Sequence, residues 1–279
     1  MKIHPTALVH PKAELADDVS VGPYAVVEEG VVVGAGTMIG SHVYLAKGTV
    51  IGEDCKIFHG AVLGMPPQDL KFTGGDTSLR IGDRTVIREY ATIHRGSHAR
   101  GETVVGSDCF IMAYAHIAHD CFLEDHVILT NMVQLAGHVT VERYAYLGGM
   151  VPVHQFVRIG QHCMVGGGYR VPKDVPPFVL AAGEPLRPVR LNIVGLRRRG
   201  FAEETIEVLH RAFRILFRSG LNTSQALRRA KEELPSIPEV EALLNFIEHS
   251  ERGIIKSVSY THLRAHETRH DLVCRLLLE

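Results

Sequence analysis

Residues Ile111–Phe122 read IMAYAHIAHDCF, which is one six-residue pattern repeated twice. Each unit begins with an isoleucine, and its fifth residue is small, namely Ala115 or Cys121. Aliphatic residues recur with this spacing from Ile3 to Leu63 and, without a break, from Val105 to Val171. A period of six matches neither an amphipathic helix nor a long alternating strand. It predicts very short strands joined by tight turns and wound into an all-β solenoid, with the aliphatic residues inside.

Two segments interrupt the period. Residues 69–80, DLKFTGGDTSLR, contain a Gly-Gly pair and no aliphatic repeat, so we expect them to leave the solenoid as a loop. Residues 99–104, ARGETV, keep the phase but begin without an aliphatic residue, so they form either a degenerate unit or a smaller loop. Binding residues concentrate on loops held by a rigid scaffold, which makes both segments candidates for a site.

The C-terminal third has a different pattern. The repeat fades after the proline pair at 176–177, and apolar residues at helical spacing follow in Phe201–Arg218 and Glu239–Arg252. Between these lies a segment that Asn222 can cap and that ends near residue 234, while Pro238 marks the start of the last one. We therefore expect a solenoid over residues 1–189 and a small helical domain over residues 190–256 that caps its open end.

Residues 257–279 continue no periodicity. They contain His262, His266 and His270, whose spacing by four would suit one face of a metal-binding helix. We favour a non-native or disordered extension without a functional role.

Composition narrows the class of protein. The net charge is −1, which argues against a nucleic-acid-binding face, and no stretch approaches the roughly 18 apolar residues of a membrane helix. The first residues show no secretory apolar region. The five cysteines include no CxxC pair, which favours a reducing, cytoplasmic compartment. Four of them share the small inward position of their units, so we expect buried fillers and not nucleophiles: Cys55, Cys109, Cys121 and Cys163.

Histidines gather on one part of the predicted solenoid. With three units per coil, residues 18 apart stack about 4.8 Å apart along the axis. The units that begin at Ile117, Leu135 and Val153 then form one wall, and they carry His119, His138 and His154. The units from Ile93, Ile111 and Leu129 are assigned to the preceding wall, with His94 and His116. These five histidines lie beside the two loops, which indicates a site.

Two kinds of chemistry suit such a site. Three histidines can hold a catalytic zinc ion, as in solenoids that resemble the γ-class carbonic anhydrases. Alternatively, one histidine acts as a general base that a carboxylate orients, with Asp120 supporting His119. Gly137 could then offer an N–H to a developing oxyanion. A non-catalytic solenoid that binds sugar nucleotides is a third possibility.

Seven segments carry a resemblance to a known family: QDLKF (68–72), TIHRG (92–96), AYAHIAHD (113–120), LAGH (135–138), GGMVPVHQF (148–156), DVPPF (174–178) and GLRRRGF (195–201). Together they resemble the UDP-N-acetylglucosamine O-acyltransferases of lipid A biosynthesis, and the likeness runs from the first unit to about residue 256. It implies a left-handed parallel β-helix of hexapeptide repeats. It also implies a cofactor-free homotrimer that transfers a 3-hydroxyacyl chain from acyl carrier protein to the sugar 3-hydroxyl, at sites between subunits.

The resemblance also implies roles for individual residues. His119 would be the general base, supported by Asp120, and Gly137 would supply the oxyanion N–H. Contacts to the sugar and to the pantetheine–acyl arm would come from Asp69, Lys71, His94, His116 and His138. The UDP group would be held by His154, Gln155, Asn192, Arg198 and Arg199, since guanidinium groups suit phosphate oxygens. Without the resemblance, the 197–199 arginines could equally be a solvated turn.

Two positions bear on specificity. Gly167, within Gly166–Gly168, lies where the resemblance places the residues that select acyl-chain length. Because it has no side chain, the groove should stay open, and we expect a longer hydroxyacyl donor. Val194 stands where some relatives carry a carboxylate, which leaves a ribose or uracil contact open. The residues do not distinguish the sugar 3-hydroxyl from a 3-amino analogue. A related N-acyltransferase is disfavoured because it carries an extra N-terminal domain, whereas the repeat here begins at Ile3.

Overall fold

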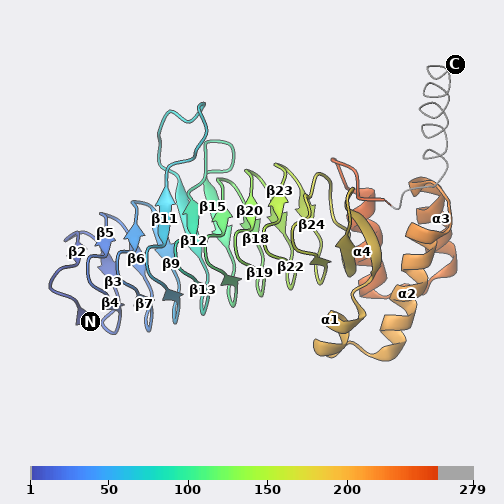
Figure 1. The fold of residues 1–279 in the computed structure, drawn as a ribbon, viewed down its shortest axis with the longest axis horizontal. Coiled ribbons are helices and arrows are strands. Elements are labelled where there is room, and N and C mark those ends of the chain that lie inside the picture. Colours follow the sequence, from blue (N-terminus) through green and yellow to red (C-terminus); the bar gives the residue numbers. More distant parts are fainter. Residues whose placement is uncertain (1, 257–279) are drawn as a thin grey trace, which may run out of the picture.

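The computed structural model describes residues 2–256. The candidate metal-binding histidines at 262, 266 and 270, and the predicted extension over 257–279, lie outside the described residues. Three sheets, parallel except for the last strand of sheet A, form the sides of a triangular β-helix, and the chain passes from one sheet to the next at each corner (Figure 1). Sheet A contains β1 (Lys2–Ile3), β4 (Ser20–Val21), β7 (Met38–Ile39), β10 (Lys56–Ile57), β13 (Val86–Ile87), β16 (Phe110–Ile111), β19 (Ile128–Leu129), β22 (Tyr146–Leu147), β25 (Met164–Val165), β26 (Val179–Ala182) and β27 (Arg187–Leu191).

The other two sides are built in the same way. Sheet B contains β2 (Leu8–Val9), β5 (Val26–Val27), β8 (Tyr44–Leu45), β11 (Val62–Met65), β14 (Thr92–His94), β17 (His116–Ile117), β20 (Gln134–Leu135) and β23 (Pro152–Val153). Sheet C contains β3 (Glu14–Leu15), β6 (Val32–Val33), β9 (Thr49–Ile51), β12 (Ser78–Ile81), β15 (Glu102–Val105), β18 (Phe122–Leu123), β21 (Thr140–Val141) and β24 (Arg158–Ile159).

The predicted inward positions form the core. From β4 onward each two-residue strand buries its second residue, and Ile39, Leu45 and Ile57 are at most 1% exposed. The cysteines at the small inward positions (Cys55, Cys109, Cys121 and Cys163) are buried and unpaired, as expected. Burial raises the pKa of the Cys109 and Cys121 thiols to about 12. These thiols therefore stay protonated near neutral pH and fill space.

Both interruptions leave the β-helix where sheet B meets sheet C, here called the B–C corner (Figure 1). Their limits differ from the prediction. The long loop spans residues 66–77 and the short loop spans residues 95–101, because Ser78–Ile81 and Glu102–Val105 pair with each other as strands. Leu79 and Thr103 are fully buried, so these four-residue strands alternate in and out. That alternation, and not the six-residue pattern, sets the strand ends.

The insertions also correct one wall assignment. Ile57 pairs with Ile87, 30 positions on, and Ile87 pairs with Ile111, 24 positions on, where regular coils repeat every 18. Ile93 consequently pairs with Ile117 in sheet B, and not with the strands of sheet A. His94 and His116 therefore lie on the same wall as Ile117, in consecutive coils, which brings the histidines closer together than the sequence suggested.

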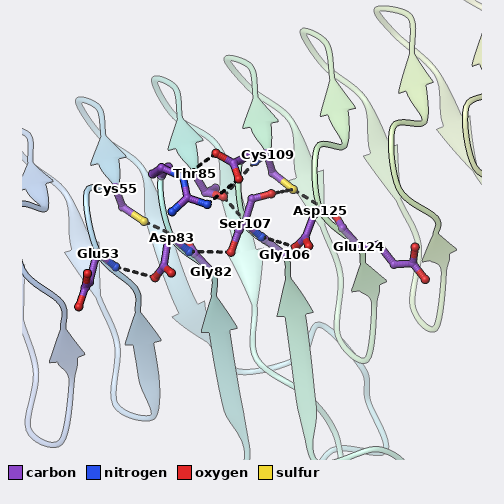
Figure 2. A network of polar contacts seen from close by, with 12 residues as sticks. Glu53, Cys55, Gly82, Asp83, Thr85, Gly106, Ser107, Cys109, Glu124 and Asp125 are labelled. Carbon is purple, nitrogen blue, oxygen red and sulfur yellow. Dashed lines mark hydrogen bonds and ion pairs between the residues drawn. The ribbon is translucent and has the colours of Figure 1, made fainter. Parts of the chain in front are cut away.

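Polar side chains link consecutive coils where sheet C meets sheet A, the C–A corner shown in Figure 2. Asp83 Oδ1 accepts a hydrogen bond of 2.9 Å from Glu53 N. One coil further, Asp83 N donates to Ser107 Oγ over 3.0 Å, and Ser107 N donates to Asp125 Oδ1 over 2.8 Å. This ladder satisfies corner N–H groups that the strands leave unpaired.

In the described part of the chain, four helices lie at the C-terminal end of the β-helix (Figure 1): α1 (Ile193–Arg198), α2 (Glu203–Arg218), α3 (Thr223–Glu233) and α4 (Pro238–Glu248). The last three were predicted, and the expected caps are present: Asn222 forms a capping box with Gln225, and Pro238 opens α4. The short helix α1 was not predicted. The domain boundary at 189/190 stays a prediction, and β27 crosses it. Within residues 2–256, no helix is long and apolar enough to cross a membrane.

Candidate active site

His119 and Asp120 occupy the B–C corner directly after β17. His119 Nδ1 lies 2.7 Å from Asp120 Oδ2, and the two side chains are 15% and 0% exposed. An ionised carboxylate at Nδ1 holds the proton on that nitrogen, so Nε2 keeps its lone pair. The pair can therefore remove a proton from a group that approaches the partly exposed imidazole.

A serine of the short loop holds Asp120 from the other side. Ser97 N donates to Asp120 Oδ1 over 2.9 Å, and Ser97 Oγ donates to Oδ2 over 2.6 Å. Burial alone would raise the pKa of Asp120, but the hydrogen bonds from Ser97 and His119 outweigh it and hold that pKa below its ordinary value. Asp120 N is also satisfied, since it donates to Thr103 Oγ1 over 2.8 Å.

Gly137 lies in the next coil, against the ring of His119. A Cβ atom at Gly137 would be 2.8 Å from both Cε1 and Nε2 of His119, so only glycine leaves room for the imidazole there. Within residues 2–256, the Gly137 N–H donates to no protein acceptor. A free N–H beside the base is what an oxyanion requires.

Three further predicted histidines surround the pair. The rings of His119 and His138 are 5.2 Å apart, and His138 Nε2 lies 3.6 Å from Asp120 Oδ2. In the same sheet the rings of His94 and His116 are 5.1 Å apart, and His116 Nδ1 lies 2.7 Å from Thr92 Oγ1. The structure therefore brings four of the five predicted histidines together.

These surrounding histidines are neutral near pH 7. Burial, helped by His116 and His119, lowers the pKa of His94 to about 4. Burial also lowers the pKa of His116 and, against the opposing charge of Asp120, the pKa of His138. Neutral imidazoles can donate or accept hydrogen bonds to a sugar without competing with His119 for its proton.

The long loop adds Asp69 to this region. Burial is the main cause of the lowered pKa of His138, and the negative charge of Asp69 opposes that shift. Asp69 Oδ1 accepts a hydrogen bond of 3.0 Å from Lys71 N, and Lys71 is exposed. Both residues are therefore available to a ligand at the B–C corner.

The remaining predicted residues lie elsewhere on this chain. His154 Nδ1 contacts the carbonyl of its neighbour Gln155 at 3.2 Å, one coil beyond Gly137. Gly167 follows β25 at the corner between sheets A and B, the A–B corner, where an added Cβ would lie 3.1 Å from Gly149 O.

Three of the five residues expected to hold UDP, Asn192, Arg198 and Arg199, line a separate cavity of about 580 Å³ on the outer face of sheet A, whereas His154 and Gln155 do not. Exposed Arg198 and Val194 line it, together with the outward residues Ile128, Tyr146, Met164 and Leu180. Asn192 is already engaged: its Oδ1 accepts from Gly195 N at 3.3 Å and its Nδ2 donates to His162 O at 3.0 Å. It caps α1, which gives it a structural role.

The two neighbouring arginines differ from Arg198. Arg199 Nη2 donates to Tyr144 O over 2.9 Å, and burial lowers the pKa of its guanidinium. Arg197 forms an exposed ion pair with Glu203, at 2.7 Å between Nε and Oε1. Among the described contacts, Arg198 and Arg190 are the exposed arginines that line the cavity without a hydrogen-bond or ion-pair partner.

Ser97 and Thr103 were missed at the sequence level. Both stand at the fifth, small position of a six-residue unit, in residues 93–98 and 99–104, so the repeat predicts only inward fillers there. The motif TIHRG ends one residue before Ser97. The sequence signal that could have identified Ser97 is its place directly after the TIHRG motif, where the short loop begins.

A β-helix of hexapeptide repeats with a histidine–carboxylate pair at one corner places the chain among the hexapeptide-repeat enzymes, and its relatives are acyltransferases. A family model described as UDP N-acetylglucosamine O-acyltransferase, domain 2, matches residues 174–255. Acyl-[acyl-carrier-protein]–UDP-N-acetylglucosamine O-acyltransferases from Thermodesulfovibrio yellowstonii and Thiobacillus denitrificans are each 49% identical, over 91% of this chain and 99% of theirs.

A crystal structure of a UDP-N-acetylglucosamine acyltransferase from Bacteroides fragilis superposes with a TM-score of 0.90 at 42% identity, covering 91% of this chain and 99% of that one. The chain belongs to the acyl-[acyl-carrier-protein]–UDP-N-acetylglucosamine O-acyltransferase family. Its fold is the left-handed parallel β-helix of these relatives.

Proposed function

We propose that this protein transfers a 3-hydroxyacyl chain from acyl carrier protein to the 3-hydroxyl of UDP-N-acetylglucosamine, the first step of lipid A biosynthesis. The observation that carries the proposal is the His119–Asp120 pair, with Nδ1 held at 2.7 Å from the buried carboxylate and Nε2 beside Gly137. Family membership supplies the two substrates, and the corner supplies the base that the reaction needs.

The reaction follows from this arrangement. His119 Nε2 takes the proton of the sugar 3-hydroxyl while the hydroxyl oxygen attacks the thioester carbonyl carbon. The carbonyl oxygen becomes an oxyanion, which the Gly137 N–H stabilises. The carbon–sulfur bond then breaks, and the imidazolium returns its proton to the thiolate of the carrier. The products are an ester and a free thiol, and Asp120 stabilises the imidazolium between the two steps.

The neighbouring groups position the substrates. We assign His94, His116, His138 and Asp69 to the sugar and the pantetheine arm, with Lys71 as the cation at the edge of the site. Arg198, together with His154, Gln155 and Arg199, would hold the UDP group. Asn192 acts indirectly, because its amide already fixes the start of α1.

The protein is proposed to work as a homotrimer. In a triangular β-helix the B–C corner is the vertex opposite sheet A, so His119 and the cavity beside Arg198 lie on different sides of one chain. One chain cannot offer both groups to one substrate molecule, whereas two packed copies can. Mixing His119→Ala and Arg198→Ala subunits should restore part of the activity that each lacks, and no recovery would contradict shared sites.

The deciding experiment is a transfer assay with 3-hydroxyacyl carrier-protein donors of several lengths, against UDP-N-acetylglucosamine and its 3-amino analogue. We expect ester formation with the 3-hydroxyl sugar. Amide formation on the analogue alone would identify an N-acyltransferase instead. The unpaired cysteines fit a reducing compartment, and we place the reaction in the cytoplasm.

A zinc hydratase is the second candidate. The ligand atoms of His119, Asp120 and His138 all lie within 4.8 Å of one another. Stoichiometric zinc in the purified protein, with loss of activity on chelation, would favour it. Activity that survives chelation would support the acyltransferase.

A further inference from the structure

We infer that Ser97 is a positioning residue of the transfer reaction: it holds the Asp120 carboxylate so that Oδ2 faces His119 Nδ1. The inference rests on the proposed function and extends it to a residue of the short loop. Its basis is a two-point contact, from Ser97 N to Oδ1 at 2.9 Å and from Ser97 Oγ to Oδ2 at 2.6 Å. Two donors on two different oxygens fix both the place and the plane of a carboxylate.

The short loop is what buries Asp120. Residues at the same position of the next two coils, His138 and Phe156, are 24% and 51% exposed, whereas the Asp120 side chain is 0% exposed. The difference coincides with the insertion of residues 95–101, whose Ser97 contacts both carboxylate oxygens of Asp120. A carboxylate placed beneath this loop loses water and needs protein donors to stay ionised.

The loop is shaped to keep Ser97 in place. Ser97 O accepts from Gly101 N at 2.7 Å, and Ser97 Oγ accepts from Ala99 N at 3.2 Å. Gly96 packs so closely that an added Cβ would lie 2.2 Å from Glu102 N. These contacts fix the backbone on both sides of Ser97, so its hydroxyl has one direction available.

Ser97 acts through Asp120 and not on substrate. It is 9% exposed, and its N–H and hydroxyl are both directed at the carboxylate. Oδ2 thereby receives two hydrogen bonds, from the serine hydroxyl and from His119 Nδ1 at 2.7 Å. Loss of the hydroxyl frees the carboxylate to rotate away from the imidazole, which then presents Nε2 less accurately.

The test compares Ser97→Ala, Ser97→Thr and Ser97→Val by kcat and KM for both substrates. Threonine and valine have nearly the same shape, but only threonine keeps the hydroxyl, so this pair separates the hydrogen bond from packing. We expect kcat to fall about 10- to 100-fold for alanine and valine, with KM changed less than about twofold. Threonine should stay within about threefold of the wild type.

Ser107→Ala is the matched control, because it removes a serine hydroxyl that accepts from Asp83 N at 3.0 Å at the C–A corner, a different corner from that of His119. It should leave kcat unchanged. In an Asp120→Ala background, Ser97→Ala should have no further effect on kcat, since the carboxylate it positions is gone.

Three outcomes would overturn the inference: unchanged kcat in Ser97→Val, equal losses in Ser97→Thr and Ser97→Val, or additive losses with Asp120→Ala. Thermal unfolding of each variant identifies any that misfolds, and the threonine–valine comparison remains decisive for those that fold. Absence of acyl transfer by the wild type would instead contradict the proposed function itself.

Discussion

Two corners of the β-helix use a serine N–H and an aspartate in nearly the same way. At the C–A corner, Ser107 N donates to Asp125 Oδ1 at 2.8 Å, and Asp125 is exposed. At the B–C corner, Ser97 N donates to Asp120 Oδ1 at 2.9 Å, and Asp120 is buried. The first contact joins consecutive coils. The second comes from an inserted loop and leaves Oδ2 to face a histidine.

The difference shows how a repetitive scaffold gains a reactive site. Regular corners satisfy their N–H groups with side chains from the next coil, as in the ladder of Figure 2. At the B–C corner Ser97 of the short loop contacts the buried Asp120, and the missing side chain of Gly137 leaves room for the imidazole of His119. Chemistry therefore arises where the repeat is interrupted, while the repeat supplies rigidity.

His119→Ala should produce the largest contrast between the corners. Loss of a general base lowers kcat by about 10²–10⁴-fold, with little change in KM, in the acyl-transfer assay. The control is His126→Ala at the C–A corner, where His126 stacks on Tyr144 with centroids 4.5 Å apart. Its kcat should stay near the wild-type value. Equal losses in both variants would mean that stability, and not catalysis, is being measured.

Gly137→Ala should impair activity without unfolding the protein. The added Cβ would meet the His119 ring at 2.8 Å, and a displaced base costs about 10²-fold in kcat. In Gly82→Ala the Cβ would instead lie 2.6 Å from Ser107 N, in the backbone of the next coil. That variant should lose about 1–3 kcal/mol of unfolding free energy while its folded fraction keeps normal kcat. Circular dichroism with kinetics separates the two.

Stability should fall in acid through histidines at both corners. Burial lowers the pKa of His94 at one corner and of His162 at the other to about 4, against about 6.5 when unfolded. Between these values the unfolded chain binds more protons, so stability is full above pH 6.5 and declines as pH falls. The loss at pH 5 is about 2 kcal/mol per histidine. Denaturant unfolding at pH 5, 6 and 7 should show a shallower slope for His94→Gln and for His162→Phe.

Gly167→Met concerns the third, A–B corner and should have the smallest effect. Gly167 is exposed and packs near Gly149, so a methionine side chain would narrow any channel along this edge. We expect preference for long over short 3-hydroxyacyl donors to drop about tenfold, read from kcat/KM for each donor. Unchanged preference would remove Gly167 from the determinants of chain length.

Much of this architecture was accessible from the sequence, because each inward position repeats and is chemically simple. Ile57, Leu63 and Cys55 are buried as their phase requires. His119 and Asp120 stand out for the same reason, since the repeat does not call for them. Ser97, the partner of Asp120, could not be predicted in this way, because it reaches the carboxylate through a loop whose path the six-residue period does not specify.

The placement of Arg198 and Gly167 shows another limit. The sequence groups them with His119 only through family likeness, while the chain puts them on different sides of the triangle. In the proposed homotrimer these residues would meet across copies, and a repeat that describes one chain does not predict such a contact.

The two insertions add 12 and 6 residues, the differences between the 30- and 24-residue steps and the regular 18. Both lengths are whole multiples of the six-residue unit, so the repeat continues in the same phase after each insertion. Insertions of this size change which residues pair between neighbouring coils, but the inward-facing residues of every unit still point into the core. A six-residue deletion within 95–101 would keep the phase and the core, and it would return Asp120 to water.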